Sequence, residues 1–403
     1  MSVLPLEGLR VLEFSHTVMG PTAGLLFADL GAEVIKVEPA PKGDHTRKLA
    51  GFASGFFGAL NRNKKSIAVN LKDPAGQQAV YELVKTADIV LENYGPGTME
   101  RLGCGYDTFE AINPKIIYLA MKGYLNGPYH HRAALDEVVQ FHVGLAYMTG
   151  PPGRPLRAGA SIIDILGAMF GVIGVQAALR ERDVTGKGQR VSSALFESAV
   201  FLMGTHMAGL VASGQPLMPM PARRGAWAIY EVFDTADDGQ LFIGVTSDQQ
   251  WHRFIEEFDL QELGDDPRMA TNESRSKERP WLLPKIQDVV KQFPQSEVAE
   301  RCERANVSFA PVGEPADLFE DIHLLKSNGL LDVFVSPQGG EQGEKVGLPN
   351  LPLEFGSGKE RTVLRSQPPS LGQHNREVME SAGLTPDHID ALMNGGVLVS
   401  SND

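Results

Sequence analysis

Cysteine is scarce in this chain of 403 residues, and its scarcity limits what the protein can be. Only Cys104 and Cys302 are present, so no disulfide framework can form, and neither cysteine has the spacing of a metal ligand. No group of His, Cys, Asp and Glu has such spacing either, which predicts a protein without a bound metal. A low number of cysteines is typical of proteins in a reducing compartment, so we expect this protein in the cytoplasm.

Basic residues are also in deficit. The chain has 37 Lys and Arg against 50 Asp and Glu, which gives a formal net charge of −13. Nucleic acids and anionic membranes are bound through basic faces, so neither is predicted as a partner. Any anionic ligand must then be met by a few locally placed cations.

Targeting and membrane segments are the third kind of feature that we do not find. The opening MSVLPLEGLRV lacks a basic region followed by a long apolar one, so no signal peptide is predicted. The apolar stretches 162–179 and 194–212 approach membrane-spanning length, but Asp164 interrupts the first, and Glu197 and His206 interrupt the second. We therefore predict two buried helices of a soluble core.

The first third of the chain alternates between strand patterns and helix patterns. Strands separated by helices of this length predict a parallel sheet with right-handed crossovers, and ligands bind at the carboxyl ends of such strands. The fold class is therefore α/β, with a Rossmann-like large domain. The predicted strands are 9–14, 32–38, 66–71, 88–93 and 115–124.

Composition changes divide the rest of the chain. Residues 1–214 form the first part of the large domain, and the Pro-rich and Met-rich stretch 215–227 is a predicted linker. Residues 228–325 contain two alternating strands around an Asp-Gly turn, followed by helices, which predicts a smaller α+β domain. Residues 326–403 again have strand, turn and helix patterns.

One charge stands out in the segment 159–167, GASIIDILG. Asp164 is the single carboxylate in a run that is otherwise small or apolar from 158 to 178. Leaving it buried and unpaired would cost several kcal/mol, so the protein should solvate, neutralise or use it. A sheltered carboxylate can be a covalent nucleophile toward an activated acyl group, but an Asp before an apolar run can also cap a helix. The residues alone leave both interpretations open.

A nicotinamide-dependent dehydrogenase is the main alternative from another class. The pattern of strand, loop, helix and strand followed by Glu38 imitates a dinucleotide-binding fold. The fingerprint GxGxxG is missing, since SHTVMGPTAG offers only Gly20 and Gly24, and Pro21 removes a backbone donor that a pyrophosphate would need.

Six ordered parts of the chain carry a family resemblance: 5–21, 29–39, 43–47, 61–76, 87–103 and the region around Asp164. Together they resemble the class III CoA-transferases, which include the formyl-CoA and carnitine CoA-transferases. This resemblance implies CoA thioesters and carboxylic acids as substrates, no permanently bound cofactor, and a homodimer of two interlocked chains. It also implies that residues 326–403 return to the large domain and that Asp164 is the nucleophile. A non-catalytic CoA-binding module remains a third possibility.

The resemblance also implies binding residues. Two positions fall near the expected nucleophile, His16 in the first loop and Asp136 in ALDEVVQ. Five fall where the family holds the nucleotide and pantetheine of CoA: Val69, Lys72, Asn93, Tyr94 and Arg101.

The chain departs from its relatives at three positions. Formyl-CoA transferase carries an arginine where this chain has Pro39 and a glutamine where it has Val18, which argues against a formyl or oxalyl substrate. The acyl-CoA racemases of the same superfamily carry a His-Asp pair where this chain has Leu135-Asp136. Without that histidine one of the two bases is missing, so racemisation is the weaker alternative.

The segment 121–171 resembles transferases that act on dicarboxylates of four or five carbons. We therefore expect a donor such as succinyl-CoA or mesaconyl-CoA. The second carboxylate needs a cation near Asp164. Arg157 and Arg47 are the predicted substrate-binding cations, with His45 and Arg132 as further candidates.

Overall fold

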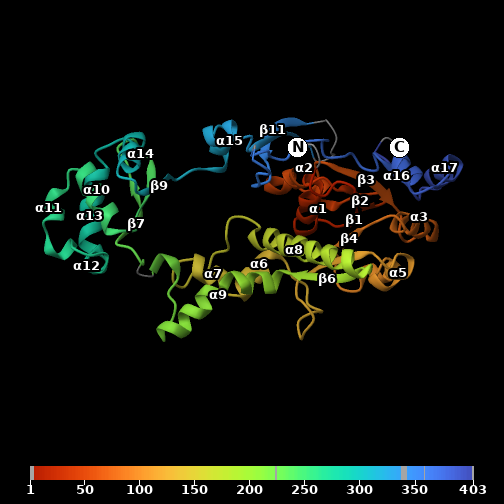
Figure 1. The fold of residues 1–403 in the computed structure, drawn as a ribbon, viewed down its shortest axis with the longest axis horizontal. Coiled ribbons are helices and arrows are strands. Elements are labelled where there is room, and N and C mark those ends of the chain that lie inside the picture. The colour runs from red at the N-terminus through yellow and green to blue at the C-terminus, as the bar shows by residue number, and fades with distance from the viewer. Residues whose placement is uncertain (1–3, 223–224, 337–342, 358, 402–403) are drawn as a thin grey trace. The chain divides into compact units, whose positions relative to one another are not determined.

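The computed structural model describes residues 4–222, 225–336, 343–357 and 359–401. The chain forms two compact units (Figure 1). The large unit consists of the described residues of Met1–Pro221 and Ile322–Asp403, and the small unit of those of Ala222–Asp321. The first junction lies within the predicted linker 215–227, and the second lies just before the predicted return at 326.

The large unit is built on a six-stranded sheet in which every pair of neighbours is parallel. The strand order β3-β2-β1-β4-β5-β6 is that of a doubly wound nucleotide-binding fold, which confirms the predicted fold class. Five strands coincide with predicted ones, but β6 was not predicted because its QRVSSA is mostly polar. The strands are β1 Arg10–Phe14, β2 Glu33–Pro39, β3 Lys64–Val69, β4 Ile89–Glu92, β5 Ile117–Lys122 and β6 Gln189–Ala194.

Both faces of this sheet are covered. Successive side chains of a strand point to opposite faces, so Val11 of β1 packs into one apolar cluster and Leu12 and Phe14 into another. The first cluster contains side chains of α1 (Met19–Asp29), α8 (Ile162–Thr185) and α9 (Leu195–Ser213). The second contains side chains of α3 (Pro74–Val84), α5 (Tyr106–Ile112), α16 (Asn375–Ser381) and α17 (Pro386–Asn394).

The C-terminal segment is part of the large unit. The N–H of Ala68 donates to Asn375 Oδ1 at 3.0 Å, and Val69 forms an isolated β-bridge with Leu398. The remaining elements of the large unit are short. They are η1 His45–Lys48, η2 Gly51–Gly55, α2 Phe56–Leu60, α4 Thr98–Arg101, α6 Asp136–His142, α7 Leu145–Thr149, α15 Ile322–Lys326 and the antiparallel pair β10 Leu330–Val335 and β11 Glu344–Pro349. The short η3, Met220–Ala222, spans the boundary between the two units in the sequence.

The small unit has an antiparallel sheet of order β7-β8-β9 with helices packed against it. Its core gathers around Trp251, Phe254, Leu282 and Cys302. Its elements are β7 Ile229–Asp234, β8 Gln240–Val245, β9 Ser308–Pro311, α10 Asp248–Glu257, α11 Gln261–Gly264, η4 Pro267–Met269, α12 Asn272–Lys277, α13 Arg279–Val290, α14 Gln295–Arg304 and η5 Pro315–Phe319.

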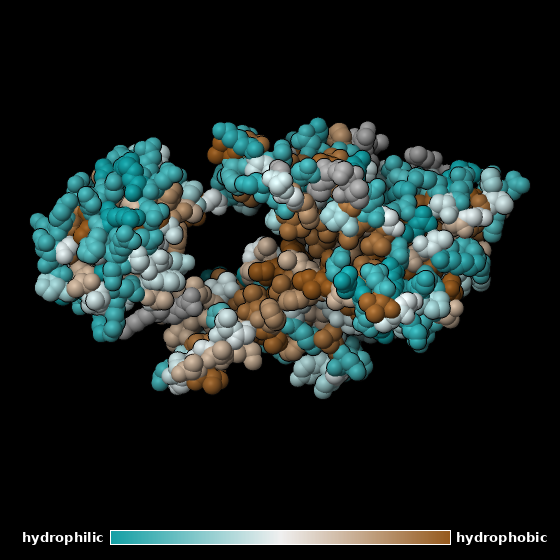
Figure 2. All heavy atoms as spheres, viewed as in Figure 1, coloured by the Kyte–Doolittle hydropathy of each residue, from teal (hydrophilic) through white to brown (hydrophobic). Residues whose placement is uncertain are grey.

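Two helices, α8 and α9, are long and apolar enough to cross a membrane by length and composition. The prediction that both are buried holds only in part for the single chain. Of the most apolar stretch, 44% is buried in α8 and only 22% in α9. Phe201, Met207 and Val211 of α9 are exposed, and Figure 2 shows hydrophobic side chains gathered over both helices.

Buried charges join the first three strands. The carboxylate of Glu13 on β1 lies 3.1 Å from Lys36 Nζ on β2 and 2.8 Å from Lys64 Nζ on β3, and all three side chains are inaccessible to solvent. Lys36 Nζ also lies 2.9 Å from Asp44 Oδ2 and donates to the carbonyl of Ser15 at 2.9 Å. This cluster therefore fixes the chain where β1 ends.

We expect the substitution Glu13→Gln to destabilise the large unit by about 3–5 kcal/mol, because it leaves two buried ammonium groups without their shared partner. Urea unfolding followed by circular dichroism measures the change. Glu82→Gln is the matched control, because Glu82 pairs with Lys85 on the exposed side of α3 and should change stability little. Equal effects of the two substitutions would contradict this role of Glu13.

Candidate active site

A cavity of about 680 Å³ opens at the carboxyl ends of β1, β4 and β5. Its walls include His16 and Thr17 after β1, Asn93 and Tyr94 after β4, and Asp164 in the first turn of α8. The strand order reverses between β1 and β4, and ligands of doubly wound sheets bind at this switch point. The cavity therefore lies where the fold predicts a ligand.

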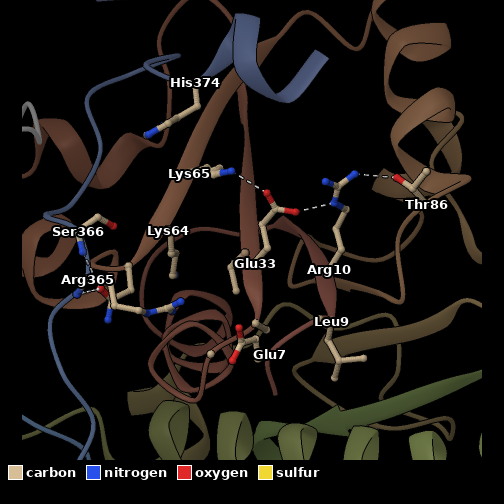
Figure 3. Close-up of a pocket in the computed structure, with 15 residues that line it drawn as sticks. Glu7, Leu9, Arg10, Glu33, Lys64, Lys65, Thr86, Arg365, Ser366 and His374 are labelled. Atoms are coloured by element: carbon tan, nitrogen blue, oxygen red, sulfur yellow. Dashed lines mark hydrogen bonds and ion pairs between the residues drawn. The ribbon is translucent and has the colours of Figure 1, made fainter. Parts of the chain in front are cut away.

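A second cavity, of about 610 Å³, lies at the opposite ends of the strands, beside Arg10, Glu33 and Lys65 (Figure 3). Glu33 accepts hydrogen bonds from Arg10 Nε at 2.6 Å and from Lys65 Nζ at 2.7 Å. Because Arg10 is already paired with Glu33, and Lys65 with both Glu33 and Glu377, the cavity that contains Asp164 is the better candidate.

Asp164 is a partly buried carboxylate that has no partner among the described residues. It accepts no hydrogen bond from the residues that the structure describes, and no cation there pairs with it. Burial, together with the nearby charges of Asp136 and Glu137, raises the pKa of Asp164 from 3.8 to about 7. A carboxylate that is this basic and opens into a cavity is suited to act as a nucleophile near neutral pH.

Asp136, rather than Asp164, caps the helix α8. Its Oδ2 accepts the backbone N–H groups of Ile163 at 2.7 Å and Asp164 at 3.0 Å, while Oδ1 accepts the amide of Gln140. Gln140 in turn accepts the N–H of Ala158 at 2.8 Å, which holds the segment before α8. The sequence left open whether Asp164 is a helix cap, and the structure gives that role to Asp136.

The loop after β1 is held from the next strand. Asn93 Oδ1 accepts the backbone N–H of His16 at 3.0 Å, and Asn93 Nδ2 donates to the carbonyl of His16 at 2.9 Å. Thr17 has a φ of 67°, a conformation that β-branched residues rarely adopt, and its Oγ1 lies 2.8 Å from His16 Nδ1 and 3.3 Å from His45 Nε2. Burial and the adjacent His45 lower the pKa of His16 to about 4, so its ring is neutral at pH 7.

The cavity brings together six of the predicted site residues: His16, Asn93, Tyr94, Asp136, Arg157 and Asp164. Three of the predicted CoA contacts lie outside its walls. Val69 is fully buried at the end of β3, and Lys72 and Arg101 are exposed. The roles predicted for these three residues stay predictions.

Arg47 also lies away from the cavity walls. Its guanidinium is buried against Glu38, with two contacts of 2.7 Å, and it lies 3.6 Å from the centre of the Phe57 ring. It also donates to the carbonyl of Pro369 at 3.1 Å. This arginine joins the end of β2 to the returning C-terminal segment, and its position gives no support to the predicted contact with substrate.

Sequence reasoning missed two features of the site. Lys122, the last residue of β5, lines the cavity and pairs with Glu92 at 2.6 Å, and its place at a strand end could have indicated it. The left-handed conformation of Thr17 has no signal in the sequence, since threonine is not a residue that favours it. Within the described parts of the chain, no three His, Cys, Asp or Glu side chains come together to hold a metal.

Comparison with known proteins identifies the family. The sequence model of CoA-transferase family III matches residues 6–375. The chain belongs to this family. It is 34% identical to succinyl-CoA:glutarate CoA-transferase of Mus musculus, across 98% of this chain and 91% of that protein. It is 32% identical to succinyl-CoA–D-citramalate CoA-transferase of Chloroflexus aurantiacus, across 96% of each.

Comparison with solved structures agrees with this family assignment. A CaiB/BaiF family protein from Brucella suis superposes with a TM-score of 0.82 at 30% identity, covering 94% of this chain and 99% of that one. The resemblance drawn from the sequence is therefore confirmed, and this CoA-transferase is an enzyme of a family that uses CoA thioesters as substrates. The family match favours the CoA-transferase interpretation over the dehydrogenase alternative.

The raised pKa of Asp164 should be visible in the stability of this CoA-transferase. The folded state keeps a proton on Asp164 up to about pH 7, whereas the unfolded chain releases it near pH 4. Stability should therefore fall as pH rises from about 4 to 7. Because Asn cannot ionise, Asp164→Asn should melt at a higher temperature than the wild type above pH 7, and the difference should vanish toward pH 4.

Differential scanning calorimetry across this pH range measures the effect. Asp183→Asn, an exposed position near the other end of α8, is the matched control. If both variants follow the pH dependence of the wild type, the environment of Asp164 does not perturb its titration.

Proposed function

We propose that this CoA-transferase moves CoA between two carboxylic acids through covalent intermediates on Asp164. The observation that carries this proposal is the unpaired carboxylate of Asp164, with a pKa of about 7, in the wall of a cavity at the switch point of the sheet. A carboxylate nucleophile conserves the energy of the thioester, since it exchanges one activated acyl group for another.

The reaction has four balanced steps. A carboxylate oxygen of Asp164 attacks the thioester carbonyl, the C–S bond breaks, and CoA leaves as a thiolate, which produces an aspartyl acyl anhydride. The thiolate then attacks the aspartyl carbonyl and releases the first acid, leaving an aspartyl-CoA thioester. In the third step the acceptor carboxylate attacks the carbonyl of the aspartyl-CoA thioester, which forms a new anhydride and releases the CoA thiolate. In the fourth step this thiolate attacks the acyl carbonyl of the new anhydride, which forms the product thioester and regenerates the carboxylate of Asp164.

The charges around Asp164 favour the covalent states. Asp136 and Glu137 repel the free carboxylate, and burial removes its solvation. An anhydride or a thioester at this position carries no charge on the aspartyl group, so its formation relieves both penalties. The neutral ring of His16 and the apolar side chain of Val18, which also line the cavity, add no further charge.

A short dicarboxylyl-CoA, such as succinyl-CoA or mesaconyl-CoA, is the donor that we propose. Relatives named succinyl-CoA:glutarate, succinate–glutarate and succinyl-CoA–D-citramalate CoA-transferases are 31–34% identical to this chain. Formyl-CoA:oxalate CoA-transferases reach 32%. The apolar Val18 in the cavity wall favours the substrates with the longer carbon chain.

Trapping the intermediate tests the function. Incubation with succinyl-CoA and hydroxylamine should convert one aspartate per chain to a hydroxamate, because the anhydride and the thioester are electrophilic and the free carboxylate is not. Mass spectrometry should locate the adduct on the peptide that contains Asp164. Asp164→Ala should lose the label and the exchange activity while remaining folded.

Two results would contradict this assignment. A label on a different residue would mean that another group is the nucleophile. Full exchange without any labelled peptide would favour direct transfer between the two bound substrates.

We also propose that two copies of the chain associate, as an interlocked dimer, and shield the site from water. The exposed apolar side chains of α9 support this dimer, because a second copy of the chain would cover a surface that proteins rarely leave open to solvent. Phe201 is 72% exposed and Val211 is 82% exposed. An anhydride hydrolyses readily, so the chemistry itself requires that water be kept away.

Sedimentation velocity should therefore show twice the mass of a single chain. Phe201→Glu should weaken this association, because it brings a charge into the apolar surface. A wild-type protein that sediments as a monomer at micromolar concentration, and is active, would contradict the dimer.

A further inference from the structure

The donor proposed above has a second carboxylate that takes no part in the reaction. The cavity that must hold it is already rich in negative charge, since Asp136, Glu137 and Asp164 line its wall. A second carboxylate entering this cavity needs a cation that is not already neutralised. The following inference rests on the proposed function, and asks which residue supplies that cation.

Most of the candidate cations are engaged elsewhere. Arg157 lies 3.3 Å from a carboxylate oxygen of Glu137, and Lys122 is bound to Glu92 at 2.6 Å. Arg47 is buried against Glu38, as described above. Arg132 lines the same cavity and has no ion pair with any residue in the described parts of the chain.

Arg132 is oriented by an aromatic side chain. Its guanidinium carbon lies 3.9 Å from the centre of the Tyr129 ring, and its backbone N–H donates to the carbonyl of Tyr129 at 2.9 Å. A stacked guanidinium uses the face of its plane for the ring, so the N–H groups at its edge remain available for a carboxylate. Stacking also reduces the number of side-chain conformers that binding would have to freeze.

Tyr129 is itself held by a neighbour in its own loop and by residues of two helices. The centre of its ring lies 5.7 Å from that of Tyr124 after β5, 5.7 Å from that of His142 on α6, and 6.4 Å from that of Phe196 on α9. These aromatic contacts fix the loop between β5 and α6 against two helices of the large unit. They therefore fix the platform on which Arg132 rests.

We propose that Arg132 binds the distal carboxylate of the transferred dicarboxylyl group and thereby selects dicarboxylyl-CoA over neutral acyl-CoA substrates. The planar guanidinium binds a carboxylate through two parallel N–H···O hydrogen bonds, a geometry that a lysine cannot reproduce. Tyr129 is a positioning residue in this arrangement, because it acts through Arg132.

Isotope exchange isolates the donor half of the reaction. The enzyme is incubated with labelled CoA and either succinyl-CoA or butyryl-CoA, and the label entering the thioester is measured without any acceptor acid. The two donors differ in having a carboxylate or a methyl group at the far end. Arg132→Ala should lower kcat/KM for succinyl-CoA about 10- to 100-fold and leave butyryl-CoA little changed.

Three further variants sharpen this test. Arg132→Lys should recover only part of the selectivity, because it keeps the charge and loses the planar fork. Tyr129→Phe keeps the stacked ring and should preserve selectivity, whereas Tyr129→Ala should lose part of it. Arg180→Ala, an exposed arginine of α8 outside the cavity wall, is the matched control.

The outcomes separate this inference from the proposed function. A wild-type protein that exchanges neither donor contradicts the proposed function itself. The role of Arg132 is overturned if Arg132→Ala lowers kcat/KM equally for both donors. It is also overturned if calorimetry shows that this variant binds CoA more weakly than the wild type. A selective loss in Arg157→Ala but not in Arg132→Ala also overturns it, in favour of Arg157.

If the wild-type protein exchanges succinyl-CoA but not butyryl-CoA, the role of Arg132 is tested with succinyl-CoA and free CoA instead. A raised KM for succinyl-CoA with an unchanged affinity for CoA in Arg132→Ala supports the proposal. If Arg132→Ala weakens the binding of succinyl-CoA and of CoA to the same extent, the proposal is contradicted.

Discussion

The site depends on the carboxylate of Glu13 and the two lysines that enclose it. Lys36 and Lys64 come from the strands β2 and β3, so this buried cluster joins three strands just before the first loop begins. Lys36 also donates to the carbonyl of Ser15, and Asn93 holds the backbone of His16 from the end of β4. The loop is thus fixed by the scaffold before any ligand arrives. Such preorganisation lets an enzyme stabilise a developing charge without reorganising at the moment of reaction.

Two aspartates that lie side by side acquire different properties from their partners. Asp136 is buried and accepts hydrogen bonds from two backbone N–H groups and from Gln140. Asp164 accepts none from the described residues and faces the charge of Asp136, which helps to raise its pKa to about 7. Asp136, which has these partners, orders the helix, and Asp164, which has none among the described residues, is the nucleophile that we propose.

Sequence patterns predicted what depends on local chemistry. The strand periodicity predicted five of the six strands of the parallel sheet. The isolation of Asp164 in an apolar run was enough to mark it as a candidate nucleophile. The cap of α8 could not be predicted, because Asp136 lies 28 residues earlier and reaches the backbone of Asp164 only through tertiary contact. Arg47 shows the same limit, since nothing in the local sequence reveals that Glu38 would bury its charge. Residue type predicts which chemistry is available, whereas the packing of distant segments decides which groups remain free to perform it.

The same packing bears on how an acidic protein would bind the acidic substrate that we propose. A formal net charge of −13 repels dicarboxylates in general, so binding must depend on individual cations within the cavity. Pairing of Arg157 with Glu137 and of Lys122 with Glu92 leaves few positive groups uncompensated there. In the arrangement that we propose, one oriented guanidinium fixes where the non-reacting carboxylate lies, and so where the thioester carbonyl lies relative to Asp164. Substrate selection and alignment for attack would then follow from this one proposed contact, because the short carbon chain between the two ends has little freedom to adjust.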